Sequence, residues 1–193
     1  MSGEIVQRKI DPTLKTWLDN QLLNPPVLPF VDPKNPVKML LLTALVCENT
    51  HEIGQDNSGP MVELFQKTIG RAEREPWCMA FIQSCVAYVE TFNFKTSLYA
   101  SEHCLTVFNN SKTLQQKDPI AGDLVIYQYG ETTKGHVELV MGVSSKTLDT
   151  IGGNTGPGKE IEREGDGVYL KKRPRGGMGT MKELGFLRVF THD

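Results

Sequence analysis

The sequence predicts an α+β fold in which N-terminal helices pack on a five- to six-stranded antiparallel sheet. Apolar residues recur at helical spacing through the first half of the chain, and short segments rich in β-branched and aromatic residues follow Asp118-Pro119. The connections between these later segments are short, which favours antiparallel pairing of strands. Helices followed by strands is the order expected of an α+β domain.

Proline marks the start of the expected helices in the main part of the chain. Pro36, Pro60 and Pro76 each precede a run with apolar residues at helical spacing, and Gly70 ends the second run. The expected helices cover residues 37–49, 61–69, 77–92 and 98–108. The expected strands, which Gly, Ser and Asn turns separate, cover residues 122–129, 135–143, 146–153, 166–172 and 185–190.

The first 36 residues differ in composition from the rest. Residues 10–23 place apolar side chains at helical spacing and predict a short amphipathic helix. Residues 24–36 hold five prolines in thirteen positions, which indicates an extended connector or a strap over the body. We therefore divide the chain into an N-terminal helix and Pro-rich connector, residues 1–36, and a main body, residues 37–193. The N-terminal part is compatible with regulation, partner binding or packing on the body.

Composition and charge narrow the classes of partner. The chain has 193 residues, 39% hydrophobic and 23% charged, and its net charge is −2. No global basic field recommends nucleic acid or a membrane surface as a partner. No apolar run reaches the roughly 18–20 residues that span a bilayer. We expect a monomer that binds no nucleic acid and has no stable membrane association.

The cysteine spacing argues against a structural metal site. Cys47, Cys78, Cys85 and Cys104 contain no CxxC pair, so we expect no zinc site and no other cofactor. The N-terminus lacks the apolar region and small-residue cleavage site of a secretory signal, which predicts synthesis in the cytoplasm. In a reducing compartment the cysteines are expected to be thiols, mostly buried.

Cys78 differs from the other cysteines in its position. It follows Pro76 by two residues and so lies in the first turn of an expected helix. Unpaired backbone N–H groups and the positive end of the helix dipole lower the pKa of a thiol there. The same N–H groups are suitably placed to stabilise an oxyanion next to the sulfur. Cys78 is therefore the candidate nucleophile, although most helical cysteines are simply small buried hydrophobes.

His136 is the candidate base. A cysteine nucleophile needs a neighbouring imidazole, and Gly135 before it lets a substrate backbone approach closely. The other histidines are less suitable: His51 falls in a polar loop, His103 in a surface helix, and His192 is the penultimate residue. A strand histidine is more often structural, so this choice is one of elimination.

Two residues compete to orient the imidazole of His136. Asn154 follows the next expected strand, where it can deliver an amide oxygen. Glu138 lies at i+2 on the same strand and face, although usually too far away for a direct hydrogen bond. We favour Asn154, while an Asn flanked by glycines is ordinarily a turn former.

Four ordered motifs resemble the CHAP group of cysteine, histidine-dependent amidohydrolases/peptidases, papain-like enzymes close to the NlpC-type peptidases. The likeness covers roughly residues 45 to 190 and includes the stretch EIGQDNSGPMVELF upstream. In chain order the motifs are PWCMAFIQSCV, P-x-x-GDLVIY, GHVELVMGV and DTIGGNTG. Many members have an acid where this chain has Gly152, so either Asn154 orients His136 unaided or Glu138 supplies the charge.

The resemblance implies a papain-like fold and the cleavage of amide bonds in bacterial peptidoglycan. Cys78, His136 and Asn154 match the nucleophile, the base and the orienting residue of the family. A small enzyme of this kind without a signal peptide resembles a phage endolysin, which reaches the cell wall after holin-dependent release, or an effector delivered by a secretion machine. The alternatives are a thiol hydrolase or acyltransferase acting on another amide, and a non-catalytic wall-binding module.

Other residues near these motifs are weaker candidates for substrate binding. Trp77 beside the nucleophile either walls the cleft or anchors the helix. Asn57, with Asp56 in the loop before the second body helix, either lines the cleft or forms a turn. Glu138 is the third candidate. The basic run KKRPR at residues 171–175 either meets anionic wall polymers or is a solvated loop, and the solvated loop is the default.

Overall fold

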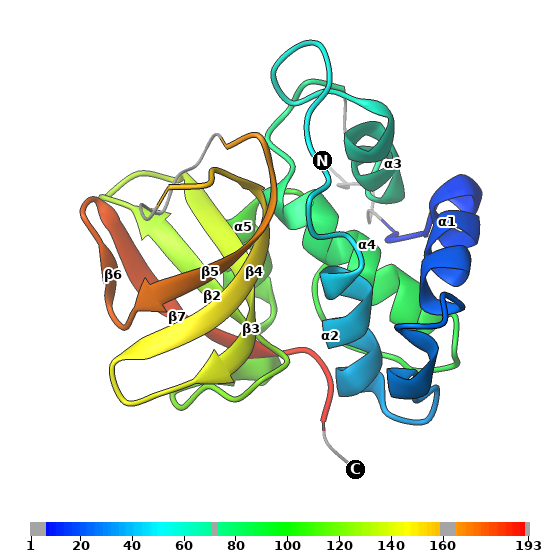
Figure 1. Ribbon diagram of the computed structural model, residues 1–193. Coiled ribbons are helices and arrows are strands. Elements are labelled where there is room, and N and C mark those ends of the chain that lie inside the picture. Colours follow the sequence, from blue (N-terminus) through cyan, green and yellow to red (C-terminus); the bar gives the residue numbers. More distant parts are fainter. Residues whose placement is uncertain (1–6, 71–72, 159–164, 192–193) are drawn as a thin grey trace.

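The computed structural model describes residues 7–70, 73–158 and 165–191 as an α+β fold with an open antiparallel sheet. Figure 1 shows α1, α2 and α3 grouped on one side of the molecule and the strongly twisted sheet on the other, with α4 beginning beside the sheet and running behind α2 toward α1. The α+β class and the antiparallel sheet predicted from the sequence are confirmed.

The helices begin where the sequence places proline. Proline is the first residue of three of them, where its missing N–H costs no hydrogen bond. The helices are α1 (Pro12–Leu22), α2 (Pro36–Leu45), α3 (Pro60–Thr68), α4 (Cys78–Glu90) and α5 (Cys104–Asn110), with 3-10 turns η1 (Leu28–Phe30) and η2 (Lys112–Leu114). The helix predicted over 98–108 is wrong in its first half. There Ser101 Oγ accepts the backbone N–H of His103, a local bond that competes with helix formation.

Five long strands form the sheet, and two short ones extend it. The strands are β1 (Gln115–Gln116), β2 (Asp123–Tyr129), β3 (Gly135–Val143), β4 (Thr147–Thr155), β5 (Gly167–Pro174), β6 (Gly177–Met178) and β7 (Met181–Arg188). Their order is β1-β7-β2-β3-β4-β5, and β6 pairs with β7. The sequence missed β1 and β6, because two-residue strands exist only through their pairing with β7 and carry no periodicity of their own.

The N-terminal helix packs on the body. Leu14, Leu18 and Leu22 of α1 are buried in the same hydrophobic core as the side chains of α2, α3 and α4. At the same contact the Tyr88 hydroxyl of α4 donates to Asp19 Oδ1 of α1 at 2.8 Å. Residues 7–36 therefore contribute to the core that supports α4.

Helix α4 is the centre of the fold. Every residue from Cys78 to Val89 is buried, which is the pattern of a helix covered on all sides. The sheet approaches it closely at Gly153 of β4, where an added Cβ would lie 2.7 Å from a ring atom of Trp77 and 2.8 Å from Phe81 Cβ. A larger residue at Gly153 would push the first turn of α4 away from the sheet.

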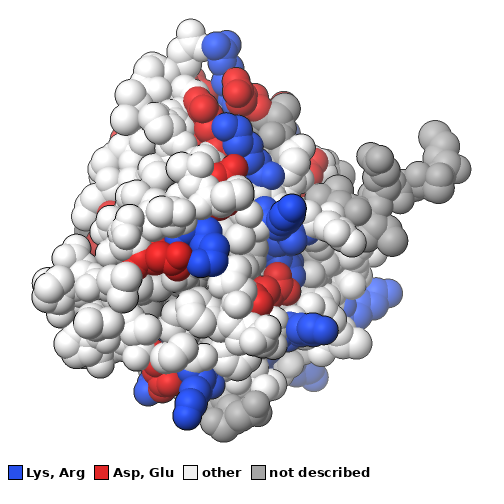
Figure 2. Space-filling view, turned by 90° about the vertical axis from the view of Figure 1, so that its right-hand side faces the viewer, with Lys and Arg blue, Asp and Glu red and all other residues white. Residues whose placement is uncertain are grey.

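The surface carries both signs of charge. Figure 2 shows Lys and Arg interspersed with Asp and Glu over the face that carries the helices. Within the described ranges, none of the helices has the length and apolar character needed to cross a lipid bilayer.

Candidate active site

The candidate nucleophile lies at the bottom of a pocket. Cys78 is the first residue of α4, and 4% of it is exposed. The pocket has a volume of about 220 Å³ and opens between the start of α4, the start of α5 and the start of β3. Its lining residues are Glu75, Pro76, Cys78, Glu102, His103, Cys104, Thr133, Lys134 and Gly135. A small polar group can therefore reach the sulfur from solvent.

The structure brings Cys78 and His136 together. Both residues lie at the ends of their elements, and each shifts the pKa of the other. Burial alone lowers the pKa of His136, but the interactions with Cys78 and Glu138 outweigh it and raise this pKa to about 9. An imidazole with such a pKa is protonated at neutral pH, which suits the imidazolium partner of a thiolate.

Several contacts stabilise the thiolate form of Cys78. The Cys104 thiol lies 3.7 Å from its sulfur and lowers the Cys78 pKa most, whereas burial acts in the opposite direction. His136 and the backbone N–H of Met79 add to the lowering, so the pKa of Cys78 falls well below its ordinary value. The Met79 contribution is the effect expected for a thiol at a helix N-terminus.

Glu138, not Asn154, contacts the imidazole. His136 Nε2 lies 3.3 Å from Glu138 Oε1. An ionised carboxylate only accepts hydrogen bonds, so Nε2 carries the proton and Nδ1 is left to exchange one with the thiol. Among the described residues no hydrogen-bond partner of standard geometry reaches Nδ1, and such catalytic contacts are often long before substrate binds. The expectation that Glu138 is too far away is wrong, because its carboxylate comes within 3.3 Å of the ring nitrogen.

A buried network fixes the Glu138 carboxylate. Arg173 of β5 donates from Nε and Nη2 to the two carboxylate oxygens at 2.6–3.1 Å. Thr150 Oγ1 of β4 donates to Oε2 at 2.6 Å. Burial raises the pKa of Glu138, but His136 and Arg173 more than offset this and lower it to about 2. Glu138 is therefore a fixed, ionised acceptor for the imidazole.

The space for this carboxylate exists because residue 152 is glycine. A Cβ at Gly152 would lie 2.7 Å from Glu138 Cγ. Gly152 lies on β4 beside the Leu139–Ile151 pair that aligns β4 with β3. The carboxylate beside His136 therefore comes from β3, and the glycine on β4 leaves room for it.

The remaining predicted site residues lie elsewhere. Asn154 is buried and lines a separate pocket of about 210 Å³ that also contains Asn57. Trp77 is fully buried, stacks on Phe65 and donates from Nε1 to Glu52 Oε1 at 2.8 Å, so its assignment to the substrate cleft is wrong. Glu138 is also fully buried, and its place is behind His136 rather than against a substrate.

Sequence reasoning missed Arg173 and Cys104. The basic run at 171–175 belongs in part to β5 rather than to a solvated loop, and Arg173 within it is fully buried. No local signal separates Arg173 from Lys171 and Lys172, which are not buried. The sequence predicts no special role for the Cys104 thiol. Only its packing at the start of α5 puts it beside Cys78.

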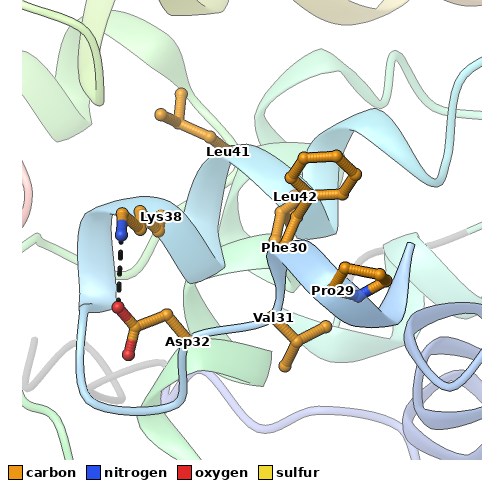
Figure 3. A pocket seen from close by; sticks show the side chains of 7 residues that line it. All are labelled: Pro29, Phe30, Val31, Asp32, Lys38, Leu41 and Leu42. Atoms are coloured by element: carbon orange, nitrogen blue, oxygen red, sulfur yellow. Dashed lines mark hydrogen bonds and ion pairs between the residues drawn. The ribbon is translucent and has the colours of Figure 1, made fainter. Parts of the chain in front are cut away.

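Two other features of the described residues bear on ligands. A pocket of about 500 Å³ opens between η1 and α2, lined by apolar side chains and by the Lys38–Asp32 ion pair at 3.3 Å (Figure 3). It does not include Cys78 or His136.

No group of three or more His, Cys, Asp or Glu side chains within the described ranges is arranged to hold a metal ion. His192 lies outside the described residues.

Comparison with known protein families, curated proteins and solved structures finds no match to this chain. The likeness to CHAP enzymes therefore rests on the four motifs alone.

Proposed function

We propose that this protein is a cysteine hydrolase that cleaves amide bonds in bacterial peptidoglycan. The observation that carries the proposal is the arrangement of Cys78, His136 and Glu138. The Cys78 thiol, at a helix N-terminus, interacts with the His136 imidazole, and the other ring nitrogen bonds the fixed carboxylate of Glu138. This order of groups is that of a nucleophile, a base and an orienting residue. The motif likeness to CHAP enzymes supports peptidoglycan as the substrate.

The proposed reaction is acyl transfer through a thioester. The Cys78 thiolate attacks the amide carbonyl, and backbone N–H groups in the first turn of α4 stabilise the oxyanion. The His136 imidazolium then gives its proton to the leaving amine, and the neutral ring accepts one from the water that hydrolyses the thioester. Glu138 stabilises the charged ring in both steps, and Arg173 with Thr150 keeps its carboxylate in place.

The pocket around the sulfur suits a peptide that carries charges. Glu75, Glu102 and Lys134 line it, together with the exposed imidazole of His103. Stem peptides of peptidoglycan carry both carboxylates and amines, so both signs of charge on the rim have partners in such a substrate. Cys78 is almost fully buried at this pocket. A narrow peptide that enters the pocket is therefore a more suitable substrate than a bulky folded protein.

The test is digestion of purified sacculi followed by mass spectrometry of the released fragments. We expect new amine ends from cut amide bonds with the wild-type protein and none with Cys78→Ala. Cys85→Ala is the matched control, because it removes a buried thiol of the same helix outside the site. Intact sacculi together with activity on another amide would favour the alternative thiol hydrolase, and inactivity on all amides would reject the mechanism.

A further inference from the structure

A second thiol lies at the active-site pocket. Cys104 is the first residue of α5, and its sulfur is 3.7 Å from that of Cys78. Both cysteines line the pocket, and 5% of Cys104 and 4% of Cys78 is exposed. Neither is in a disulfide. Two sulfurs in contact at the bottom of a solvent-connected pocket form a dithiol that a small reagent can reach.

We propose that Cys78 and Cys104 form a reversible dithiol–disulfide site that takes hydrogen peroxide as its oxidant. In the first step the Cys78 thiolate attacks one peroxide oxygen, the O–O bond breaks, and a sulfenic acid forms as hydroxide leaves. In the second step the Cys104 sulfur attacks the Cys78 sulfur, the S–O bond breaks, and the Cys104 proton leaves with the hydroxyl as water. Cys78 loses two electrons to the peroxide, and the product is one S–S bond.

The geometry favours the second step over further oxidation of Cys78. The two sulfurs must approach from 3.7 Å to about 2 Å, the length of a disulfide bond. Cys104 can supply this movement, because it begins a short helix that follows a stretch without regular structure, residues 94–103. Cys78 in contrast is held by α4. A neighbouring thiol so close intercepts the sulfenic acid before a second peroxide arrives.

The consequence for catalysis rests on the proposed function. A disulfide occupies the sulfur that the acyl-transfer mechanism uses, so oxidised protein would cleave nothing until a thiol reductant restores both cysteines. Formation of the bond itself depends only on the geometry of the two sulfurs. The two claims can therefore fail separately.

The chain supplies an internal control. Cys47 and Cys85 form a second pair of neighbouring thiols in the core, where burial raises the pKa of Cys85 well above its ordinary value and Cys47 adds to the effect. Each is 1% exposed, and the Cys47 thiol donates to the Thr43 carbonyl at 3.3 Å. A protonated thiol reacts poorly with peroxide, so Cys85 tests whether a neighbouring thiol alone, without an activated thiolate, is enough for oxidation.

The test is cysteine mapping of the full chain after peroxide treatment at neutral pH. Thiols that remain are alkylated under denaturing conditions, and the digest is analysed by mass spectrometry. We expect the loss of two hydrogens, a linked peptide pair that contains Cys78 and Cys104, and complete alkylation of Cys47 and Cys85. A sulfinic acid on Cys78 with Cys104 still alkylated, a Cys47–Cys85 link, or four unreacted thiols would each overturn the proposal.

A variant adds the reversibility test. With Cys104→Ser we expect peroxide to carry Cys78 to the sulfinic acid, which dithiothreitol does not reverse, whereas the wild type returns to two thiols. Cys47→Ser should behave like the wild type. If Cys104→Ser does not fold, the wild-type mapping alone decides. Sacculus cleavage measured in parallel separates the proposals: a disulfide in a protein that cuts no sacculi rejects only the function, and cutting without disulfide formation rejects only the switch.

Discussion

Two thiols on one helix have opposite properties. Cys78 and Cys85 lie seven residues apart on α4, and both are buried. The pKa of Cys78 lies well below the ordinary thiol value, whereas that of Cys85 lies well above it. Burial raises the pKa of both, so burial cannot explain the difference. The partners of each sulfur do.

The start of a helix and its middle offer a thiol different partners. At Cys78 the Cys104 thiol, then His136 and then the backbone N–H of Met79 stabilise the sulfur as a thiolate. Around Cys85 the helix N–H groups bond within the helix, and the neighbouring Cys47 thiol raises the pKa further. The comparison shows that one helix holds two thiols with opposite pKa shifts within two turns, and that Cys104 of α5 and His136 of β3 distinguish Cys78 from Cys85.

We expect the greatest loss of activity when Cys78, the candidate nucleophile, is replaced. Cys78→Ala should lower the rate of amide cleavage by roughly 10⁴-fold or more, as removal of a nucleophile does in hydrolases of this logic. Cys85→Ala should leave the rate within about threefold and only reduce stability by about 1 kcal/mol for the lost sulfur. Both rates are measured on sacculi, and stability by urea unfolding. Equal losses in the two variants would contradict the assignment of Cys78.

A smaller loss of activity is expected for Glu138, which contacts the imidazole of His136. Glu138→Gln should lower kcat by about 10²–10⁴-fold, because the ring loses the charge that stabilises its protonated form. Activity requires protonated His136, so it is lost as pH rises through about 9, and this alkaline limb should move to lower pH in the variant. Asn154→Ala is the comparison variant. If it lowers kcat more than Glu138→Gln does, and if the alkaline limb of the pH profile stays in place in Glu138→Gln, Asn154 and not Glu138 orients the imidazole.

The smallest effect is expected for Arg173, the partner of Glu138, and it is an effect on stability. Arg173→Lys keeps the charge but loses the planar fork that bonds both carboxylate oxygens, so we expect a loss of about 1.5–3 kcal/mol in the free energy of unfolding. Lys172→Arg on the same strand should change little, because its ion pair with Asp149 is exposed. Urea unfolding of the two variants measures the difference, and similar stabilities would exclude a structural role for the buried guanidinium.

Local sequence signals predicted the fold class and the candidate pair Cys78 and His136. Proline at helix starts located the first turn of α4, and the gain of β-rich segments after Asp118-Pro119 located the sheet. Cys78 stands out because it follows the proline that opens its helix, and His136 follows by elimination among the four histidines. The structure brings the two side chains into interaction, with Cys78 lining the pocket and His136 fully buried.

The rest of the site depends on contacts that no local pattern encodes. Arg173 and Glu138 come from β5 and β3, with β4 between them, and meet only because Gly152 leaves room. Cys104 reaches Cys78 through the packing of α5. The sequence favours Asn154 as the residue beside His136, whereas the structure places Glu138 there, since the direction of a long side chain along its strand is set by neighbours on other strands.

The pH dependence of cysteine alkylation is the decisive measurement for an activated thiolate at Cys78. Iodoacetamide labels thiolates, so the rate at each cysteine, followed by mass spectrometry of native protein, reports the pKa of that sulfur. We expect Cys78 to react with a midpoint well below the ordinary value of about 8.5, and Cys85 to stay unlabelled until the protein unfolds. A Cys78 midpoint at the ordinary value, or labelling of both cysteines at the same rate, would contradict an activated thiolate at the start of α4.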